Sequence, residues 1–259
     1  MQIRVSRENL KEIKDWFADY VDSYKKGDPE IQENIELKED HTGRVCKEIL
    51  RIGERLGLTE EELNLAELIA LLHDVGRFEQ YARYRTFKDS KSENHAELGV
   101  KIIEEKEILK RLNDDVQDTI VKSIRYHNHP TLPADERESL LFYSKLLRDA
   151  DKLDIWKVVT DYYSRKDGKR NRALELELPD SPGYSQEVAR NLKNKKSVHM
   201  KYVRNLNDFK LLQAGWIFDI NFEPSMEMVK QRRYLQKIRE ALPESAEIDE
   251  IFDFIYNNV

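Results

Sequence analysis

Apolar residues recur at intervals of three and four along most of the chain, which is the spacing of one buried face on a helix. The first such segment runs from about Val5 to Lys26 and is ended by the breaker Gly27-Asp28-Pro29. A second begins near Asn34 and continues to Leu56, where Gly57 supplies a stop signal. The pattern therefore predicts a helix in each segment, and the second of these helices contains His41.

A third segment opens with the capping-box sequence Thr59-Glu60-Glu61-Glu62, which predicts a helix start. It becomes almost wholly apolar over residues 68–72, immediately before His73-Asp74 and Gly76. Such a run is typical of a central, buried helix. The stretch from Arg77 to Asn94 is polar and aromatic without a sustained helical stripe, so it is predicted to be a loop.

Helical spacing returns further along the chain, interrupted by Asn113 and by the breaker at residues 129–133. Residues 164–200 are highly charged and contain Ser181-Pro182-Gly183, which indicates an insertion or a flexible segment. Further helices are predicted over residues 94–110, 114–126, 138–163, 205–220, 224–242 and 248–256. The expected fold is an all-α helical bundle forming one compact domain over residues 1–259, with its core at about 34–163 and accessory helices at 201–259.

The composition supports this fold class and limits the kinds of partner. Charged residues make up 36% of the chain, which contains only 9 glycines and 7 prolines, a balance that favours amphipathic helices. The net charge of -6 offers no broad basic field for an extended nucleic acid or an anionic membrane. The single cysteine, Cys46, and the absence of a long apolar run favour a cytoplasmic protein. The composition leaves the oligomeric state open.

Five of the six histidines lie between positions 41 and 129, each near a predicted helix boundary or apolar face. The adjacent pair His73-Asp74 follows the most apolar helix in the chain. A carboxylate near a core is costly unless a cation or hydrogen bonds compensate it. Imidazole and carboxylate ligands together suit first-row divalent ions. The pattern therefore predicts a divalent metal site.

The order of these residues is H…HD…H…H…D, in the stretches LLHDVGR, NHAELGVKII, SIRYHNHP and LLRDADKLDIW. From about Asp40 to Trp156 the chain resembles the HD-domain superfamily of metal-dependent phosphohydrolases. The resemblance implies a helical core that holds one metal ion through His41, His73, Asp74 and Asp151. In members with two ions, the residues matching His95 and His127 bind the second ion and the aspartate matching Asp74 bridges both. The expected cofactor is therefore a pair of divalent ions, drawn from Fe, Mn, Zn, Ni, Co or Mg.

The resemblance implies hydrolysis of a phosphoester, with a nucleotide or another small phosphorylated metabolite as substrate and metal-activated water as nucleophile. The predicted catalytic residues are Asp74, Arg77 and His129, with Arg77 clamping phosphate and His129 donating a proton to the leaving oxygen. Alternatively, Arg77 is a surface cation on a loop. The predicted substrate-binding residues are Arg44, Arg77, Arg83, Tyr84, Arg85, Arg148 and Lys152.

Two other functions fit the same ligand order. The chain also resembles the di-iron HD oxygenases typified by myo-inositol oxygenase, and a ligand-sensing or structural protein is a third alternative. The branch that cleaves cyclic dinucleotides has two adjacent histidines, whereas this chain has His127-Asn128-His129 and lacks the GYP signature of that branch. Asp149 and Asp154 are expected to support Asp151, and Cys46 is expected to be a buried structural thiol.

Overall fold

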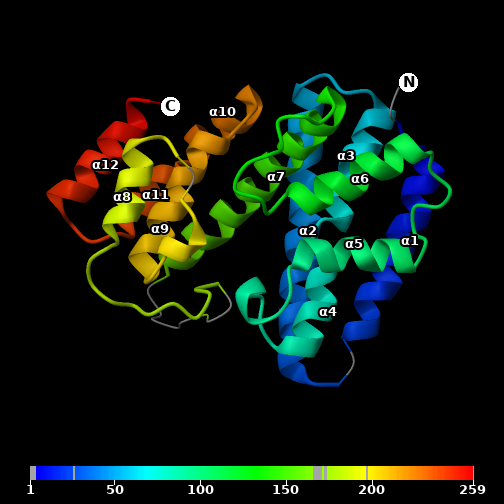
Figure 1. The fold of residues 1–259 in the computed structure, drawn as a ribbon, viewed down its shortest axis with the longest axis horizontal. Helices are drawn as coiled ribbons and strands as arrows, with labels where there is room; N and C mark the ends of the chain where they lie inside the picture. Colours follow the sequence, from blue (N-terminus) through cyan, green and yellow to red (C-terminus); the bar gives the residue numbers. More distant parts are fainter. Residues whose placement is uncertain (1–3, 26, 166–170, 172–173, 197, 259) are drawn as a thin grey trace. The chain divides into compact units, whose positions relative to one another are not determined.

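A computed structural model describes residues 4–25, 27–165, 171, 174–196 and 198–258. These residues form helices joined by turns and contain no strand, which confirms the predicted all-α class (Figure 1). Contacts divide the chain into two compact units, Met1–Asp154 and Ile155–Val259. The single domain expected over residues 1–259 stays a prediction. None of the described helices combines the length and apolar character that a membrane span requires.

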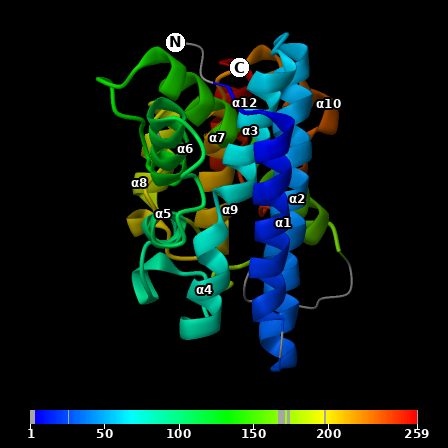
Figure 2. The ribbon, with the colours of Figure 1, turned by 90° about the vertical axis from the view of Figure 1, so that its right-hand side faces the viewer.

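The first unit begins with two helices that lie alongside each other, α1 (Arg7–Tyr24) and α2 (Pro29–Arg55) (Figure 2). The Asp28 side chain accepts a hydrogen bond from the Glu30 backbone N–H, and Pro29 occupies the first turn of α2. Aspartate before a helix and proline at its start are both favourable. The Gly27-Asp28-Pro29 breaker therefore also starts the next helix, and α2 begins five residues before the predicted position.

The central apolar helix is α3 (Glu60–Leu72), as predicted. Its capping box is formed, with the Thr59 backbone N–H donating to the Glu62 carboxylate at 2.8 Å. Helix α3 contacts α1, α2 and α6. The fully buried side chains of its apolar part include Leu65, Ala66, Leu68, Ile69, Ala70 and Leu72. The chain leaves this core at His73, so the first polar residues after the apolar run are held at its edge.

Helix α4 (Val75–Tyr84) includes residues 77–84 of the stretch that was predicted to be a loop, and that prediction is wrong for these residues. Val75, Phe78 and Tyr81 are buried at a spacing of three residues. The stripe was hard to recognise because the helix is short and because the polar Gln80, outside this stripe, is fully buried as well. The helix ends at Arg85, which adopts a left-handed conformation with φ of 54°.

The rest of the first unit consists of the short 3-10 helix η1 (Asp89–Lys91) and the helices α5 (His95–Glu105), α6 (Asp114–Tyr126) and the start of α7 (Glu138–Tyr163). Helices α4 and α5 approach closely at Gly76 and Gly99. A Cβ atom on Gly76 would overlap the His95 carbonyl oxygen and lie 2.6 Å from the Gly99 nitrogen. Only glycine fits at this crossing, which joins the helix following Asp74 to the helix that begins at His95.

The second unit contains α8 (Gln186–Lys193), η2 (Met200–Tyr202), α9 (Leu206–Gly215), η3 (Trp216–Asp219), α10 (Glu223–Arg232), α11 (Tyr234–Glu240) and α12 (Ala246–Tyr256). Helix α8 packs against α9 and α12, and α11 packs against α9 and α10. The single helix predicted over residues 224–242 is instead divided at Arg233, whose φ is 56°.

The segment 164–200, predicted to be an insertion or flexible, contains the packed helix α8. Val188 and Leu192 are fully buried and Ala189 is nearly so. This helix therefore contributes to the core of the second unit. Residues 166–170, 172–173 and 197 of the same segment lie outside the described residues.

Candidate metal centre

The six side chains predicted to bind metal lie together in the first unit, as two groups whose potential ligand atoms are within 4.8 Å of one another. We call His41, His73 and Asp151 the first cluster and Asp74, His95 and His127 the second cluster. The residues come from α2, the end of α3, the start of α4, the first residue of α5, the end of α6, and α7. Five of the six are buried, and Asp151 is partly exposed.

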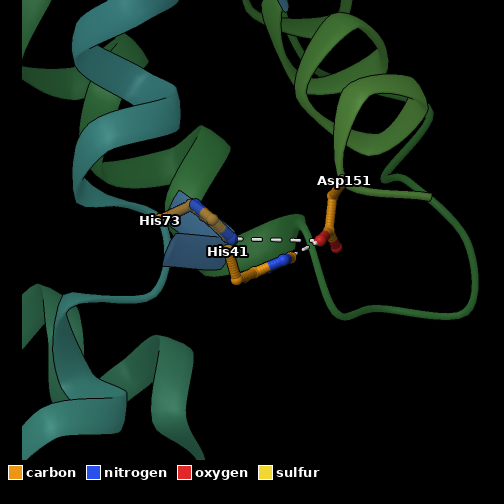
Figure 3. A group of neighbouring side chains, drawn as sticks. All are labelled: His41, His73 and Asp151. Carbon is orange, nitrogen blue, oxygen red and sulfur yellow. Dashed lines mark ion pairs between the residues drawn. The ribbon is translucent and has the colours of Figure 1, made fainter. Parts of the chain in front are cut away.

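In the first cluster, two imidazoles face one carboxylate (Figure 3). His41 Nε2 lies 3.2 Å and His73 Nε2 3.9 Å from Asp151 Oδ1. Asp151 extends from α7 toward the two histidines, which come from elements far apart in the sequence. The helices thus bring together ligand types that no local sequence motif could unite.

Asp74 connects the two clusters through its separate carboxylate oxygens. Its Oδ2 lies 3.5 Å from His41 Nε2 and 3.6 Å from His73 Nε2. Its Oδ1 lies 3.5 Å from His95 Nε2 and 3.9 Å from His127 Nε2. The carboxylate stands at the N-terminus of α4, where the helix dipole favours a negative charge. Asp74 therefore has the geometry of a ligand shared by two ions.

Two of the four imidazoles are oriented by backbone carbonyls. His73 Nδ1 lies 2.7 Å from the Ala70 carbonyl oxygen, and His127 Nδ1 lies 2.6 Å from that of Ile124. A carbonyl oxygen can only accept, so Nδ1 must carry the hydrogen in both rings. Nε2 is then the unprotonated atom of the neutral ring, and it faces the cluster.

The other two imidazoles are oriented by carboxylates that are not themselves members of a cluster. His41 Nδ1 lies 2.7 Å from Asp154 Oδ2, and His95 Nδ1 lies 2.8 Å from Asp89 Oδ2. Asp154 also accepts two hydrogen bonds from the Arg44 guanidinium. A carboxylate behind a ligating imidazole fixes its tautomer and raises its basicity. All four histidines thus direct Nε2 toward the clusters.

Burial keeps three of these rings neutral. It lowers the pKa of His73 and of His95, and it lowers the pKa of His127 to about 3 with help from the neighbouring histidines. For His41, burial and Lys38 act to lower the pKa, but the carboxylates of Asp151 and Asp154 outweigh them and the pKa is raised. Neutral imidazoles are the form that binds metal.

The carboxylates of the clusters are held in the ionised form. Burial acts to raise the pKa of Asp74, but the positive charges of Lys38 and Arg77 place it well below its usual value. Burial likewise opposes ionisation of Asp151, and the nearby His41 ring outweighs it, so the pKa of Asp151 is also lowered. Deprotonated carboxylates beside neutral imidazoles are the protonation states that metal binding requires.

Two observations show that the residues fit divalent cations. His73 Nε2 and Asp151 Oδ1 are buried without a hydrogen-bond partner, which costs about 1–3 kcal/mol for each atom. In the second cluster, His95 Nε2 and His127 Nε2 are 3.0 Å apart, and two bare nitrogens so close repel each other unless a proton or cation lies between them. Ligands about 2.1 Å from one ion are roughly 3.0–3.4 Å apart at right or tetrahedral angles, close to the shorter separations found.

Arg77 and Arg148, two of the predicted substrate-binding residues, are engaged in structural hydrogen bonds. Arg77 Nη1 donates to the Phe87 carbonyl at 2.6 Å and to Asp89 at 3.0 Å, while its Nε lies 3.5 Å from Asp74 Oδ1. Arg148 Nη1 donates to three carbonyls at the end of α6, including those of residues 127 and 129. Arg77 therefore borders the second cluster, and Arg148 caps α6.

The other predicted substrate-binding residues make several different kinds of contact. Arg44 pairs with the carboxylate behind His41, and Lys152 is buried with its Nζ donating to the Arg148 carbonyl. Three residues at the end of α4 form exposed polar contacts: Arg83 with Glu79, Tyr84 with Glu93, and Arg85 with Asp28. Their roles toward substrate stay predictions.

The predicted proton donor His129 is half-buried, and its ring packs on Tyr126 with centroids 5.4 Å apart. Its catalytic role also stays a prediction.

Sequence reasoning missed two residues of the site, Lys38 and Asp89. Lys38 precedes His41 by one helical turn, a spacing that could have drawn attention to it. Asp89 begins the three-residue 3-10 helix η1 before α5, which is too short for spacing to give such a signal.

Residues 39–156 match the family model for the HD domain. No curated protein and no solved structure matched the chain. The matched range contains both clusters, and HD domains bind divalent metals. Proteins with this domain are generally metal-dependent hydrolases. By this match and by its assembled histidines and aspartates, the chain contains an HD domain, formed by residues 39–156.

Proposed function

We propose that this chain is a dinuclear metal-dependent phosphohydrolase that acts on a phosphoester of a nucleotide or another small phosphorylated metabolite. The observation that carries the proposal is the position of Asp74, with one oxygen facing two Nε2 atoms of the first cluster and the other facing two of the second. Two ions bridged by a carboxylate are a recurring arrangement in enzymes that cleave phosphoesters.

The ligand sets follow from these contacts. His41, His73, Asp151 and Asp74 Oδ2 would hold one ion, and His95, His127 and Asp74 Oδ1 would hold the other. When bound, divalent ions lower the pKa of a coordinated water and neutralise charge on phosphoryl oxygens. The second set supplies fewer protein donors, which leaves more of its coordination sphere for water or substrate.

The remaining residues position and neutralise. Asp154 and Asp89 fix the His41 and His95 rings, which keeps each Nε2 aimed at its cluster. Arg77, 3.5 Å from Asp74, adds positive charge beside the second cluster and would offset phosphoryl charge there. We also propose that His129, two residues after His127, donates a proton to the leaving oxygen.

The proposal is tested by metal analysis of the purified protein and by a panel of phosphomonoesters and nucleotides with added Mn²⁺, Co²⁺, Ni²⁺ or Mg²⁺. We expect metal-dependent phosphate release that does not require oxygen. His73→Ala should lose bound metal and activity together, whereas the control His199→Ala, at an exposed position in the second unit, should keep both. Retained iron with substrate-dependent oxygen uptake and no phosphate release would contradict the proposal and support an oxygenase.

A further inference from the structure

Lys38 places an ammonium group at the bridging carboxylate. Its Nζ donates to Asp74 Oδ2 at 2.8 Å, the same oxygen that faces His41 Nε2 and His73 Nε2. Lys38 stands on α2, one turn before His41. The ligand and the cation therefore extend from the same helix toward the same carboxylate oxygen.

The Lys38 side chain is also accessible. The exposed fraction of the Lys38 side chain is 19%, compared with 4% for the Asp74 side chain that it contacts. Its Nζ lies 5.5 Å from the centre of the Phe87 ring, within the range of a cation–π interaction. Phe87 is held by the Tyr81 ring and by the Arg77 hydrogen bond to its carbonyl. The ammonium thus lies near both the metal centre and a fixed aromatic ring, on a side chain that is partly exposed to solvent.

The other cations near the clusters are committed differently. Arg44 directs two nitrogens to Asp154, and Arg77 Nη1 is shared among Gln80, Phe87 and Asp89. An ammonium carries three donors, and the hydrogen bond to Asp74 uses one of them. Lys38 can therefore contact a second anionic oxygen without leaving Asp74.

We propose that Lys38 is a substrate-binding residue that donates a hydrogen bond to a phosphoryl oxygen of the substrate at the metal centre. This inference rests on the proposed phosphohydrolase function and specifies the residue that recognises the transferred group. A point charge next to the first cluster suits the phosphoryl oxygens that every phosphoester shares. Lys38 accordingly favours a terminal phosphate over an uncharged substrate, whatever the remainder of the molecule.

The test measures binding of inorganic phosphate, the common product of phosphohydrolysis, to the full chain loaded with Mn²⁺. Titration calorimetry would compare the unaltered protein with Lys38→Gln, Lys38→Arg and the control Lys47→Gln, an exposed lysine on the same helix. Bound metal and helical content are measured for each. We expect Lys38→Gln to bind phosphate about 10-fold to 100-fold more weakly, the range for a charge-assisted hydrogen bond, with its metal content unchanged.

Lys38→Arg keeps the charge and should bind phosphate within a few-fold of the unaltered protein, as should Lys47→Gln. Equal phosphate affinity in the unaltered protein and in Lys38→Gln would overturn the assignment while leaving the proposed hydrolase intact. Loss of metal from Lys38→Gln, with phosphate affinity unchanged once metal is restored, would overturn it in favour of a purely supporting role. Unaltered protein that binds neither metal nor phosphate would overturn the proposed function as well.

Discussion

The first and second clusters contain the same kinds of side chain but differ in the number of donor groups that they offer. The first has two imidazoles, its own carboxylate and one oxygen of Asp74, whereas the second has two imidazoles and the other oxygen of Asp74. The first therefore offers four donors and a larger share of negative charge. It also contains the two buried ligand atoms without partners, His73 Nε2 and Asp151 Oδ1. We infer that the first cluster binds its ion more tightly and that the second is the more open to substrate.

The two clusters share one structural device. In each cluster, one imidazole is oriented by the carbonyl three residues earlier in the chain. The other imidazole is oriented by a carboxylate that belongs to neither cluster. A carbonyl at that position is provided by the end of the helix itself. A carboxylate must be supplied by another part of the chain, so the His41 and His95 sides depend on the tertiary fold.

The largest effect is expected from Asp74→Ala, because this substitution removes a ligand from both clusters at once. Metal content should fall to a trace, and phosphoester hydrolysis should fall by about 1,000-fold or more, as for removal of a central electrostatic group. Metal analysis and initial rates measure the two effects. Asp15→Ala, an exposed carboxylate on α1, is the control and should change neither. Two ions retained in Asp74→Ala would show that the bridge is not needed.

Asp151→Asn and His127→Ala separate the clusters. Asp151→Asn should weaken the tighter site and lower total metal content more than His127→Ala does. His127→Ala should leave one ion per chain and reduce activity, since only the second cluster loses a ligand. Competition with a chromophoric chelator measures both affinities. The difference between the clusters would be refuted if His127→Ala lost both ions while Asp151→Asn kept both.

Asp154→Asn and Asp89→Asn test the orienting carboxylates. Each substitution removes the negative charge behind one ligating imidazole, so each should lower metal affinity by about 10-fold to 100-fold. Asp154→Asn should act on the first ion and Asp89→Asn on the second. The chelator competition that separates the clusters also separates these effects. Unchanged affinity in both variants would mean that the rings are oriented by packing alone.

Gly76→Ala tests the close approach of α4 and α5. Its added methyl would meet the backbone of His95 and Gly99, so we expect a loss of about 1–3 kcal/mol in the free energy of unfolding, as for an overpacked core. Gly43→Ala on α2 is a matched control, because its methyl would meet nothing within 4 Å. Denaturant unfolding measures both. A Gly76→Ala protein as stable as the control would contradict the crossing.

The smallest effect is expected at Cys46, which is buried and belongs to neither cluster. Burial raises the pKa of its thiol to about 12, so the thiolate is scarce at neutral pH. Native protein should therefore resist a thiol reagent at pH 8 and react only after unfolding. Reaction of the folded protein at the rate of a free cysteine would show that this part of α2 is open.

The grouping of the six candidate metal ligands could be anticipated from the sequence because their order and residue types are specific. Helix starts such as Thr59 are marked by local signals. Helix α4 could not be anticipated, because burial of Gln80 depends on Asp89, Ser92 and Glu93 accepting its hydrogen bonds. The contact of Lys38 with Asp74 likewise joins residues 36 positions apart. Spacing along one helix predicts which residues share a face, but it does not predict which distant side chain they meet.

The most direct test of the central claim is the number of divalent ions bound per chain, measured by elemental analysis after loading with Mn²⁺ and removal of excess metal. A shared Asp74 predicts two ions in the unaltered protein, one in His127→Ala and none in Asp74→Ala. A single ion in the unaltered protein, bound with equal affinity by His127→Ala, would contradict the dinuclear centre.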